Sequence, residues 1–497
     1  MKIILKIFLN FSFLLSIHYL SSEVKYQKVD RFERWYEVFL DNFKVGHAHT
    51  FIQEINHIIF SQTVFEFSIK RGRDLIKIST EEKTEETIDG KILGFSSKIK
   101  MSDIPVIKKG WVIGDNIFIQ ENHFPQKVIK KYDLDKEGLM TWGFIKFIRD
   151  QGFKKERKDA SAKIYSADFG MEKPTPALVK FLGETTLKIN GIDKKAYGLK
   201  ISLKSAKGNF NTFSWLDEEG YAIKTSMHLN GMPIEIIESS KEKALVKINS
   251  NDFLMNSLIP INKEIPNNSR YVEFRLTSTN ESLQKNFYQN RHQKVERINS
   301  KNLIIKISNE DWRNKESYKT IIPNYEFLKP NPMINSRDPL IQSLSRSAGK
   351  GSKNIFDLSD RLLVYSHNFI NNRNFKVGFA SASEVARKKE GDCTEHAVFL
   401  AALGRSMGIP SRIASGLVFF KEFKSTKNVL GFHMWTEFFL KGKWITFDSA
   451  LNKIGTQTDR ITFSVTSLNN CSVYEIGSEI YELIGNLNVK VEKIENY

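Results

Sequence analysis

Three residues in the last third of the chain have the types and the order needed for thiol-based nucleophilic catalysis. Cys393 follows Gly391 and Asp392, and His433 and Asp448 come after it along the chain. In such chemistry the cysteine attacks as a thiolate, the histidine moves its proton, and the aspartate holds the histidine in the required tautomer. The three can act together only if the elements that carry them bring their side chains into contact.

The sequence predicts a helix from about Cys393 to about Met407, with the cysteine in its first turn. Asp392 is a favourable N-cap residue, and Glu395, three residues later, completes a capping-box pattern. Gly408 suits the left-handed position that ends a helix. The unpaired N–H groups and the positive end of the helix dipole favour a thiolate in the first turn, and the same groups can hold an oxyanion.

A hairpin is predicted to bring the histidine and the aspartate together. Strands are expected at 412–420, 432–440 and 443–448, and Lys441-Gly442 forms a two-residue turn between the last two. With that register, alternation places five side chains on one face of the hairpin: His433, Trp435, Trp444, Thr446 and Asp448. His433 and Asp448 become diagonal neighbours roughly 7 Å apart, within reach of a side-chain hydrogen bond.

Other residues near the predicted site allow alternative roles. His396 is a rival base three residues after Cys393, but a base on the same helix has little freedom to swing toward a substrate. Trp435 and Trp444 either line the cleft or pack in the core. The cysteine, histidines and aspartate could ligate a metal by residue type, but their spacing matches no common zinc pattern. We therefore expect neither a metal nor a cofactor.

Four motifs in this region resemble the transglutaminase-like superfamily, a branch of the papain-like thiol enzymes. They are Gly391-Asp392-Cys393, Gly408-Ile409-Pro410-Ser411-Arg412, His433-Met434-Trp435-Thr436-Glu437, and Gly442-Lys443-Trp444 followed by Asp448. One departure is Ser449, where many relatives have proline after the aspartate. The resemblance implies Cys393 as nucleophile, His433 as base and Asp448 as orienting residue. It covers the chain from about Asp338 onward and supplies no substrate.

The first residues predict export. Met1-Lys2 is followed by an apolar run over 3–20 and by Ser21-Ser22, which is typical of a secretory signal or an uncleaved membrane anchor. We expect a periplasmic, secreted or membrane-anchored protein whose only membrane contact is this segment. Two cysteines, Cys393 and Cys471, do not make a disulfide framework in a chain of 497 residues. We expect Cys471 to be an inert, buried thiol.

The net charge of +17 comes from lysines scattered along the whole chain. It allows attraction to anionic envelope components, although a generally lysine-rich composition explains it more simply. No nucleic-acid-binding motif accompanies the charge, so no nucleic-acid partner is expected.

Length and pattern predict an α+β protein of several domains. Residues 1–22 are the signal or anchor, 24–250 an antiparallel β-rich domain, 251–335 a small β module or linker, and 336–497 the transglutaminase-like catalytic domain. We expect a thiol enzyme that acts on peptide or carboxamide bonds of a protein or peptide substrate, with hydrolysis favoured because water needs no acceptor site. The alternatives are a crosslinking transglutaminase and a non-catalytic envelope-binding or assembly protein.

Overall fold

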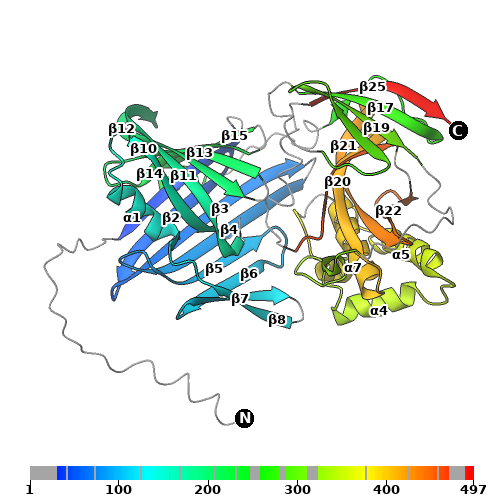
Figure 1. Cartoon of the computed structure of the whole chain (residues 1–497), viewed down its shortest axis with the longest axis horizontal. Coiled ribbons are helices and arrows are strands. Elements are labelled where there is room, and N and C mark those ends of the chain that lie inside the picture. Colours follow the sequence, from blue (N-terminus) through cyan, green and yellow to red (C-terminus); the bar gives the residue numbers. More distant parts are fainter. Residues whose placement is uncertain are drawn as a thin grey trace, which may run out of the picture.

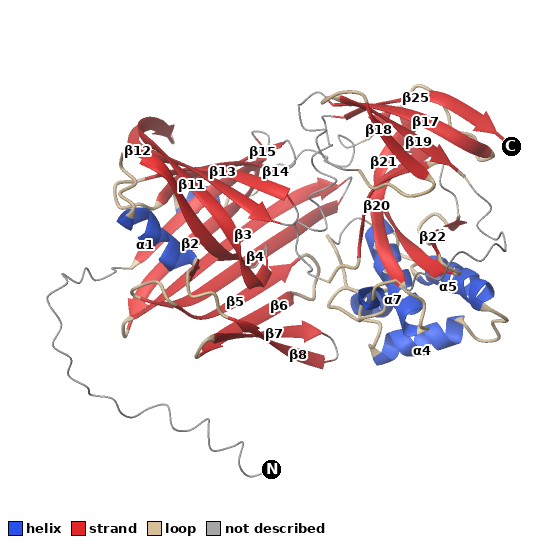
Figure 2. Ribbon diagram, in the orientation of Figure 1, coloured by secondary structure: helices blue, strands red, loops and turns tan. Residues whose placement is uncertain are grey.

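The computed structural model describes residues 31–40, 43–71, 74–123, 126–155, 157–166, 170–205, 208–229, 232–246, 258–278, 287–309, 323–374, 378–423, 426–455, 458–469 and 487–497. The predicted signal segment and Cys471 lie outside these residues. The described chain contains a large antiparallel β region followed by a mixed α and β region (Figures 1 and 2). The predicted α+β fold class is confirmed.

The β-rich region is one sheet of fifteen strands in the order β8-β7-β6-β5-β4-β3-β2-β1-β15-β14-β13-β12-β11-β10-β9. The strands are β1 (Phe32–Leu40), β2 (Phe43–Ile55), β3 (Ile58–Arg71), β4 (Asp74–Thr87), β5 (Ile92–Lys100), β6 (Val106–Ile113), β7 (Asn116–His123), β8 (Gln126–Asp133), β9 (Gly138–Leu139), β10 (Arg157–Ser166), β11 (Gly170–Ile189), β12 (Ile192–Ser205), β13 (Gly208–Leu216), β14 (Ala222–Leu229) and β15 (Met232–Ser239). Helices α1 (Thr141–Asp150) and α2 (Lys241–Ala244) accompany them.

The two halves of this sheet curl toward each other and share a core (Figure 1). Phe95 and Ile117 from one half pack with Tyr165 and Met171 from the other, and all four are buried. Strand alternation sends one set of side chains into this core and turns the alternate set to the outer face.

In the carboxyl-terminal region, the described residues of 323–469 place four helices against a sheet with the order β23-β22-β21-β20-β24. The helices are α4 (Pro339–Ala348), α5 (Ile355–Phe369), α6 (Ala382–Lys388) and α7 (Cys393–Ser406), after a 3-10 turn at Tyr325–Phe327. The strands are β20 (Ser411–Phe423), β21 (Thr426–Leu440), β22 (Lys443–Asp448), β23 (Lys453–Ile454) and β24 (Arg460–Thr466), and β16 (Ile259–Pro260) pairs with β21. Helix α7 packs closely on β21 at Gly404. A Cβ at this position would lie 2.4 Å from the ring of Phe438, so a residue without a side chain is needed there.

A third sheet has the order β18-β19-β17-β25 and combines distant parts of the chain. Its strands are β17 (Ser269–Ser278), β18 (Gln293–Arg297), β19 (Asn302–Ser308) and β25 (Leu487–Asn496). The closing strand β25, assigned from the sequence to the 336–497 domain, therefore pairs with the 251–335 module instead. The reason is its apolar alternation, which buries Leu487, Val489 and Val491 in the core of that module.

Candidate active site

Helix α7 begins at Cys393, and the buried side chains of Asp392 and Glu395 hold this end of the helix in place. The Asp392 side chain accepts a hydrogen bond from the backbone N–H of Thr394 at 2.9 Å, and the Glu395 side chain accepts one from the backbone N–H of Asp392 at 2.9 Å. The predicted capping box is therefore present. Cys393 is partly exposed, and its backbone N–H has no hydrogen-bond partner among the described residues. The thiol thus stands at the positive end of a fixed helix, beside an available N–H donor.

The β21–β22 hairpin brings His433 to Asp448. Leu440 pairs with Lys443 across the turn, where Lys441 and Gly442 have φ values of 46° and 83°. Such positive φ values suit a tight two-residue hairpin turn. The His433 Nε2 and Asp448 Oδ2 atoms are 2.9 Å apart, and both side chains are buried. This bond occupies Nε2 and leaves the other ring nitrogen, Nδ1, for Cys393.

Cys393 and Asp448 both favour the protonated form of His433. Burial alone lowers the pKa of His433, but the charges of Asp448 and Cys393 and the polar contacts with both side chains outweigh it and raise this pKa to about 10. A protonated imidazole beside a cysteine is the arrangement of a thiolate–imidazolium pair. The site can therefore hold a proton on His433 before a substrate arrives.

Arg460, at the start of β24, is a site residue that the sequence analysis missed. Its Nη1 donates to Asp448 Oδ2 at 3.2 Å, and its Nε donates to Asp459 Oδ1 at 2.9 Å. The guanidinium carbon lies 5.0 Å from the centre of the Trp435 ring, and the side chain is fully buried. An arginine at the first position of an apolar strand, directly after an aspartate, was the only signal in the sequence.

The charge of Asp448 is maintained by its neighbours. Burial raises the pKa of the Asp448 carboxyl, but His433, Arg460 and the backbone N–H of Leu451 hold this pKa well below its usual range. Leu451 donates to Oδ1 at 3.1 Å, so both carboxylate oxygens are occupied. A fully ionised Asp448 can fix the His433 ring and stabilise its cation.

Glu395 links the helix start to the preceding segment. Its Oε1 accepts the backbone N–H of Ala380 at 2.9 Å, and its Oε2 lies 2.9 Å from the hydroxyl of Thr394. Burial and the charge of Asp392 raise the pKa of Glu395 to about 8, despite these hydrogen bonds. A neutral Glu395 can donate to Thr394, whose hydroxyl can then donate to Asp392 at 2.9 Å. This network fixes the loop that leads into Cys393.

The segment before the nucleophile is also held by the β-rich region. The backbone N–H groups of Gly378 and Phe379 donate to the Met101 carbonyl at 2.9 and 3.3 Å. The Ser102 hydroxyl donates to the buried Glu384 carboxylate at 2.6 Å, and the Asp103 N–H donates to it at 3.1 Å. The apolar core of the carboxyl-terminal region also includes residues from β4 and β5 or just after it: Ile76, Ile78, Ile99 and Met101.

The remaining predicted site residues have supporting positions. His396 is 2% exposed, and neither ring nitrogen has a hydrogen-bond partner among the described residues. Burial, followed by the charge of Arg373, lowers the pKa of His396 to about 4, so its ring is neutral. Trp435 is 1% exposed and packs beside His433, with ring centres 6.3 Å apart. Trp444 lies under the Arg412 guanidinium at 4.1 Å. Trp435 therefore packs in the interior beside His433, whereas Trp444 is half-buried against Arg412.

The described residues contain neither a cluster of metal-binding side chains nor a membrane-spanning helix. They contain no group of three or more histidine, cysteine or acidic side chains placed to hold a metal ion. They also contain no helix with the length and apolar character required to cross a bilayer.

Comparison with known proteins gives one family match. Residues 342–449 match the family described as the transglutaminase-like superfamily. No curated protein sequence matches the chain. The matched segment runs from within α4 to the residue after Asp448, and it contains Cys393 and His433.

Three solved structures resemble parts of the chain. A β-barrel-like protein with a domain of unknown function from Brucella abortus shares 10% identity, over 43% of this chain and 97% of that one, with a TM-score of 0.36. A candidate cysteine protease from Cytophaga hutchinsonii shares 14%, over 46% and 90%, with a TM-score of 0.29. A candidate protease from Parabacteroides distasonis shares 10%, over 69% and 63%, with a TM-score of 0.18. The family match is the finding that identifies the core: residues 342–449 of this chain form a transglutaminase-like domain.

Proposed function

We propose that the chain is an exported thiol enzyme that hydrolyses peptide or carboxamide bonds through Cys393, His433 and Asp448. The observation that carries the proposal is the position of His433, whose Nε2 lies 2.9 Å from Asp448 Oδ2 and whose protonated form is favoured by both Asp448 and Cys393. A histidine that bridges a thiol and a buried carboxylate has the two contacts that nucleophilic acyl transfer requires.

The proposed reaction has two acyl-transfer steps. The Cys393 sulfur attacks the carbonyl carbon, and the oxyanion that forms accepts a hydrogen bond from the Cys393 backbone N–H at the helix start. The protonated His433 then gives its proton to the departing amine, which leaves a thioester on Cys393. His433 next takes a proton from water, the hydroxide attacks the thioester, and the acid product departs. The proton on His433 returns the pair to its starting state.

An amine in place of water in the second step would make the enzyme a transglutaminase. The triad serves both reactions equally, and hydrolysis is favoured because it needs no acceptor groove. Mass spectrometry of a peptide library, with and without a primary amine, distinguishes them. We expect cleaved or deamidated peptides in both samples. Amine-incorporated products without cleavage or deamidation would replace hydrolysis with transamidation.

A non-catalytic envelope-binding or assembly protein is the second candidate. It is favoured by the size of the fifteen-stranded sheet, which lies outside the matched domain. Replacement of Cys393 by alanine separates the two candidates in cells. If the protein is an enzyme, cells with Cys393→Ala should show the same phenotype as cells that lack the protein. If these cells instead behave like the wild type, the binding or assembly role is favoured.

Export is part of the proposal and rests on the composition of residues 1–22. We expect a fusion with a carboxyl-terminal reporter to fractionate outside the cytoplasm. A cytoplasmic product that retains Met1 would contradict export and the substrates that export implies.

A further inference from the structure

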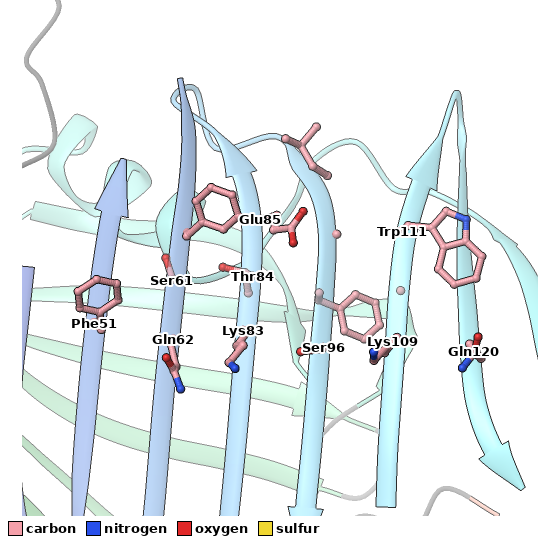
Figure 3. Close-up of a pocket in the computed structure, with 15 residues that line it drawn as sticks. Phe51, Ser61, Gln62, Lys83, Thr84, Glu85, Ser96, Lys109, Trp111 and Gln120 are labelled. Carbon is pink, nitrogen blue, oxygen red and sulfur yellow. The ribbon is translucent and has the colours of Figure 1, made fainter. Parts of the chain in front are cut away.

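The outer face of strands β2–β7 carries a cavity of about 470 Å³ in the β-rich region (Figure 3). Two rows of side chains cross it at right angles to the strands. The first row consists of direct register partners on six strands: Phe51, Gln62, Lys83, Ser96, Lys109 and Gln120. The second row, two residues further along the strands, is Phe60, Glu85, Gly94, Trp111 and Phe118. We call this feature the outer trough.

The second row provides aromatic walls and a low floor. The Trp111 and Phe118 rings are nearly parallel, at an interplanar angle of 10° with centres 6.0 Å apart. Gly94 lies between Trp111 and Glu85, and a Cβ there would be 3.1 Å from the Gly110 carbonyl oxygen and 3.8 Å from Glu85 Oε2. Because Gly94 has no side chain, the space between the Trp111 and Glu85 side chains on its two sides stays open.

The first row and its surroundings are basic. Lys83 and Lys109 are exposed, and Lys83 also pairs with Glu81 at 2.9 Å. The same face of β4–β8 carries five further exposed lysines: Lys77, Lys98, Lys100, Lys127 and Lys131. Against these seven lysines, the described residues of this face on β2–β8 have four acids: Glu66, Glu81, Glu85 and Asp133. The trough therefore lies in a positive field.

We propose that the outer trough binds an anionic oligosaccharide. One face of a sugar ring exposes C–H groups, which pack well on an aromatic platform such as Trp111 and Phe118. Lysines and glutamine amides can bind the acidic groups and hydroxyls, and neighbouring strands place them roughly 4.8 Å apart, close to the length of one sugar unit. Both sources of anionic sugar, uronic acids and sugar phosphates, share this chemistry.

Two other classes of ligand fit the trough less well. Strands β2–β7 are paired on both sides, so the trough offers no free strand edge for an extended peptide. An acyl chain would have to cover the polar row that contains Gln62, Lys83 and Lys109, at the cost of their hydration. The trough is thus amphipathic along its whole length, as a carbohydrate site requires. It involves no residue of the Cys393 site, and binding is independent of catalysis.

Isothermal titration calorimetry on the full chain carrying Cys393→Ala tests the proposal. The probes are hexagalacturonate, its neutral methyl ester, phosphorylated maltohexaose and polyglutamate of matched charge. We expect hexagalacturonate or phosphorylated maltohexaose to bind at least ~10-fold more tightly than the methyl ester or polyglutamate, a difference of about 1.4 kcal/mol. Which of the two binds identifies the source of the anion.

Variants at two exposed lysines and at the half-buried Trp111 assign binding to the trough. Trp111→Ala and the double variant Lys83→Gln/Lys109→Gln should each lower the affinity for the anionic oligosaccharide ~10-fold or more. Only the double variant should make that affinity less dependent on salt concentration. Trp111→Phe keeps an aromatic platform and should retain binding. The matched control is Lys180→Gln/Lys200→Gln, directly paired lysines on β11 and β12, which should bind as the parent does.

Three results would overturn the proposal. The first is no binding of either anionic sugar at millimolar concentration. The second is equal affinity for polyglutamate, which would make the face a general polyanion site. The third is that the protein captures phosphatidylglycerol vesicles, loses this capture in Trp111→Ala and binds neither sugar. That result would make the outer trough a lipid site.

Discussion

Arg460 donates to Oδ2 of Asp448, the same oxygen that lies 2.9 Å from Nε2 of His433. The two cations flank one carboxylate oxygen inside the protein, and Arg460 Nε also binds Asp459. A buried anion persists only when its charge is compensated. Arg460 therefore acts through Asp448 and positions His433 without touching the thiol.

Replacement of Arg460 by glutamine should move the acid limb of the pH–activity profile. Arg460 helps to hold the pKa of Asp448 below its usual range, so its loss raises that pKa. Asp448 then becomes protonated at a higher pH. We therefore expect the apparent pKa of the acid limb of the kcat/KM profile to increase by about 1 to 2 pH units. The profile between pH 3 and 8 measures the shift.

Arg412→Gln is the matched control for this variant. Arg412 is also buried, and it binds the Glu437 carboxylate at 2.7 Å on the same sheet. Its loss should destabilise the protein by a similar amount, roughly 3 to 5 kcal/mol, without moving the acid limb. Equal shifts in the two variants would reduce Arg460 to a structural residue.

Iodoacetamide should label Cys393 before Cys471 near neutral pH. Cys393 is partly exposed beside a protonated His433, whereas Cys471 has no comparable sequence context. His433→Ala should slow labelling of Cys393 by ~10-fold or more, because the cation that favours the thiolate is lost. Peptide mapping after brief exposure measures both rates, and Cys471 serves as the internal reference. Equal labelling of the two cysteines would leave the triad unsupported.

Asp448→Asn should reduce turnover far more than it reduces alkylation. The amide cannot hold the same His433 tautomer, and loss of the equivalent carboxylate in a serine protease lowers kcat by about 10⁴-fold. Alkylation needs the thiolate but no proton transfer by His433 to a leaving group, so its rate should fall less. The comparison requires kcat and the alkylation rate on the same preparation. A parallel loss of both would mean that the variant disturbs Cys393 itself.

The local parts of the site were predictable from the sequence because each depends on residues close in the chain. The capping box at Asp392 and the turn at Lys441-Gly442 are encoded within a few positions, and the turn fixes the register of His433 and Asp448. Contacts that depend on distant pairing were not predictable. Arg460 reaches Asp448 because β24 pairs with β20, with Val418 opposite Arg460.

The same distinction holds for the fold. Short antiparallel strands and their turns predicted a β-rich region, but not one continuous sheet of fifteen strands, which needs β1 to pair with β15. The pairing of β25 with β17 likewise joins a segment that precedes residues 342–449 to one that follows them. No local pattern specifies which exposed strand edge a distant strand will join.

Stability should fall as pH rises above neutrality, because two buried groups bind protons more tightly in the folded protein. The pKa of His433 is raised from 6.5 to about 10, so its contribution is complete below pH 6.5 and is lost as pH approaches 10. The pKa of Glu395 is raised from 4.5 to about 8, so its contribution is lost between those values. Each contributes on the order of a few kcal/mol.

Urea unfolding at several pH values separates these two groups. His433→Gln should flatten the decline between pH 8 and 10, whereas Glu395→Gln should flatten the decline below pH 8. A wild-type unfolding free energy that stays constant from pH 6 to 10 would contradict the protonated state assigned to His433.

Ser102→Ala should lower the stability of the carboxyl-terminal region, although Ser102 itself lies in the β-rich region. The Ser102 hydroxyl donates at 2.6 Å to Glu384, a buried carboxylate in the helix that precedes Cys393. A hydrogen bond to a charged group contributes about 1.5 to 3 kcal/mol, and its loss should also loosen the segment that leads to the nucleophile. We expect lower thermal stability and slower alkylation of Cys393, with Ser102→Thr restoring both. Ser61→Ala is the control, since Ser61 lies in β3 of the same β-rich region and is buried, but its hydroxyl has no partner among the described residues. If Ser102→Ala behaved like Ser61→Ala in both measurements, the β-rich region would not help to position Cys393.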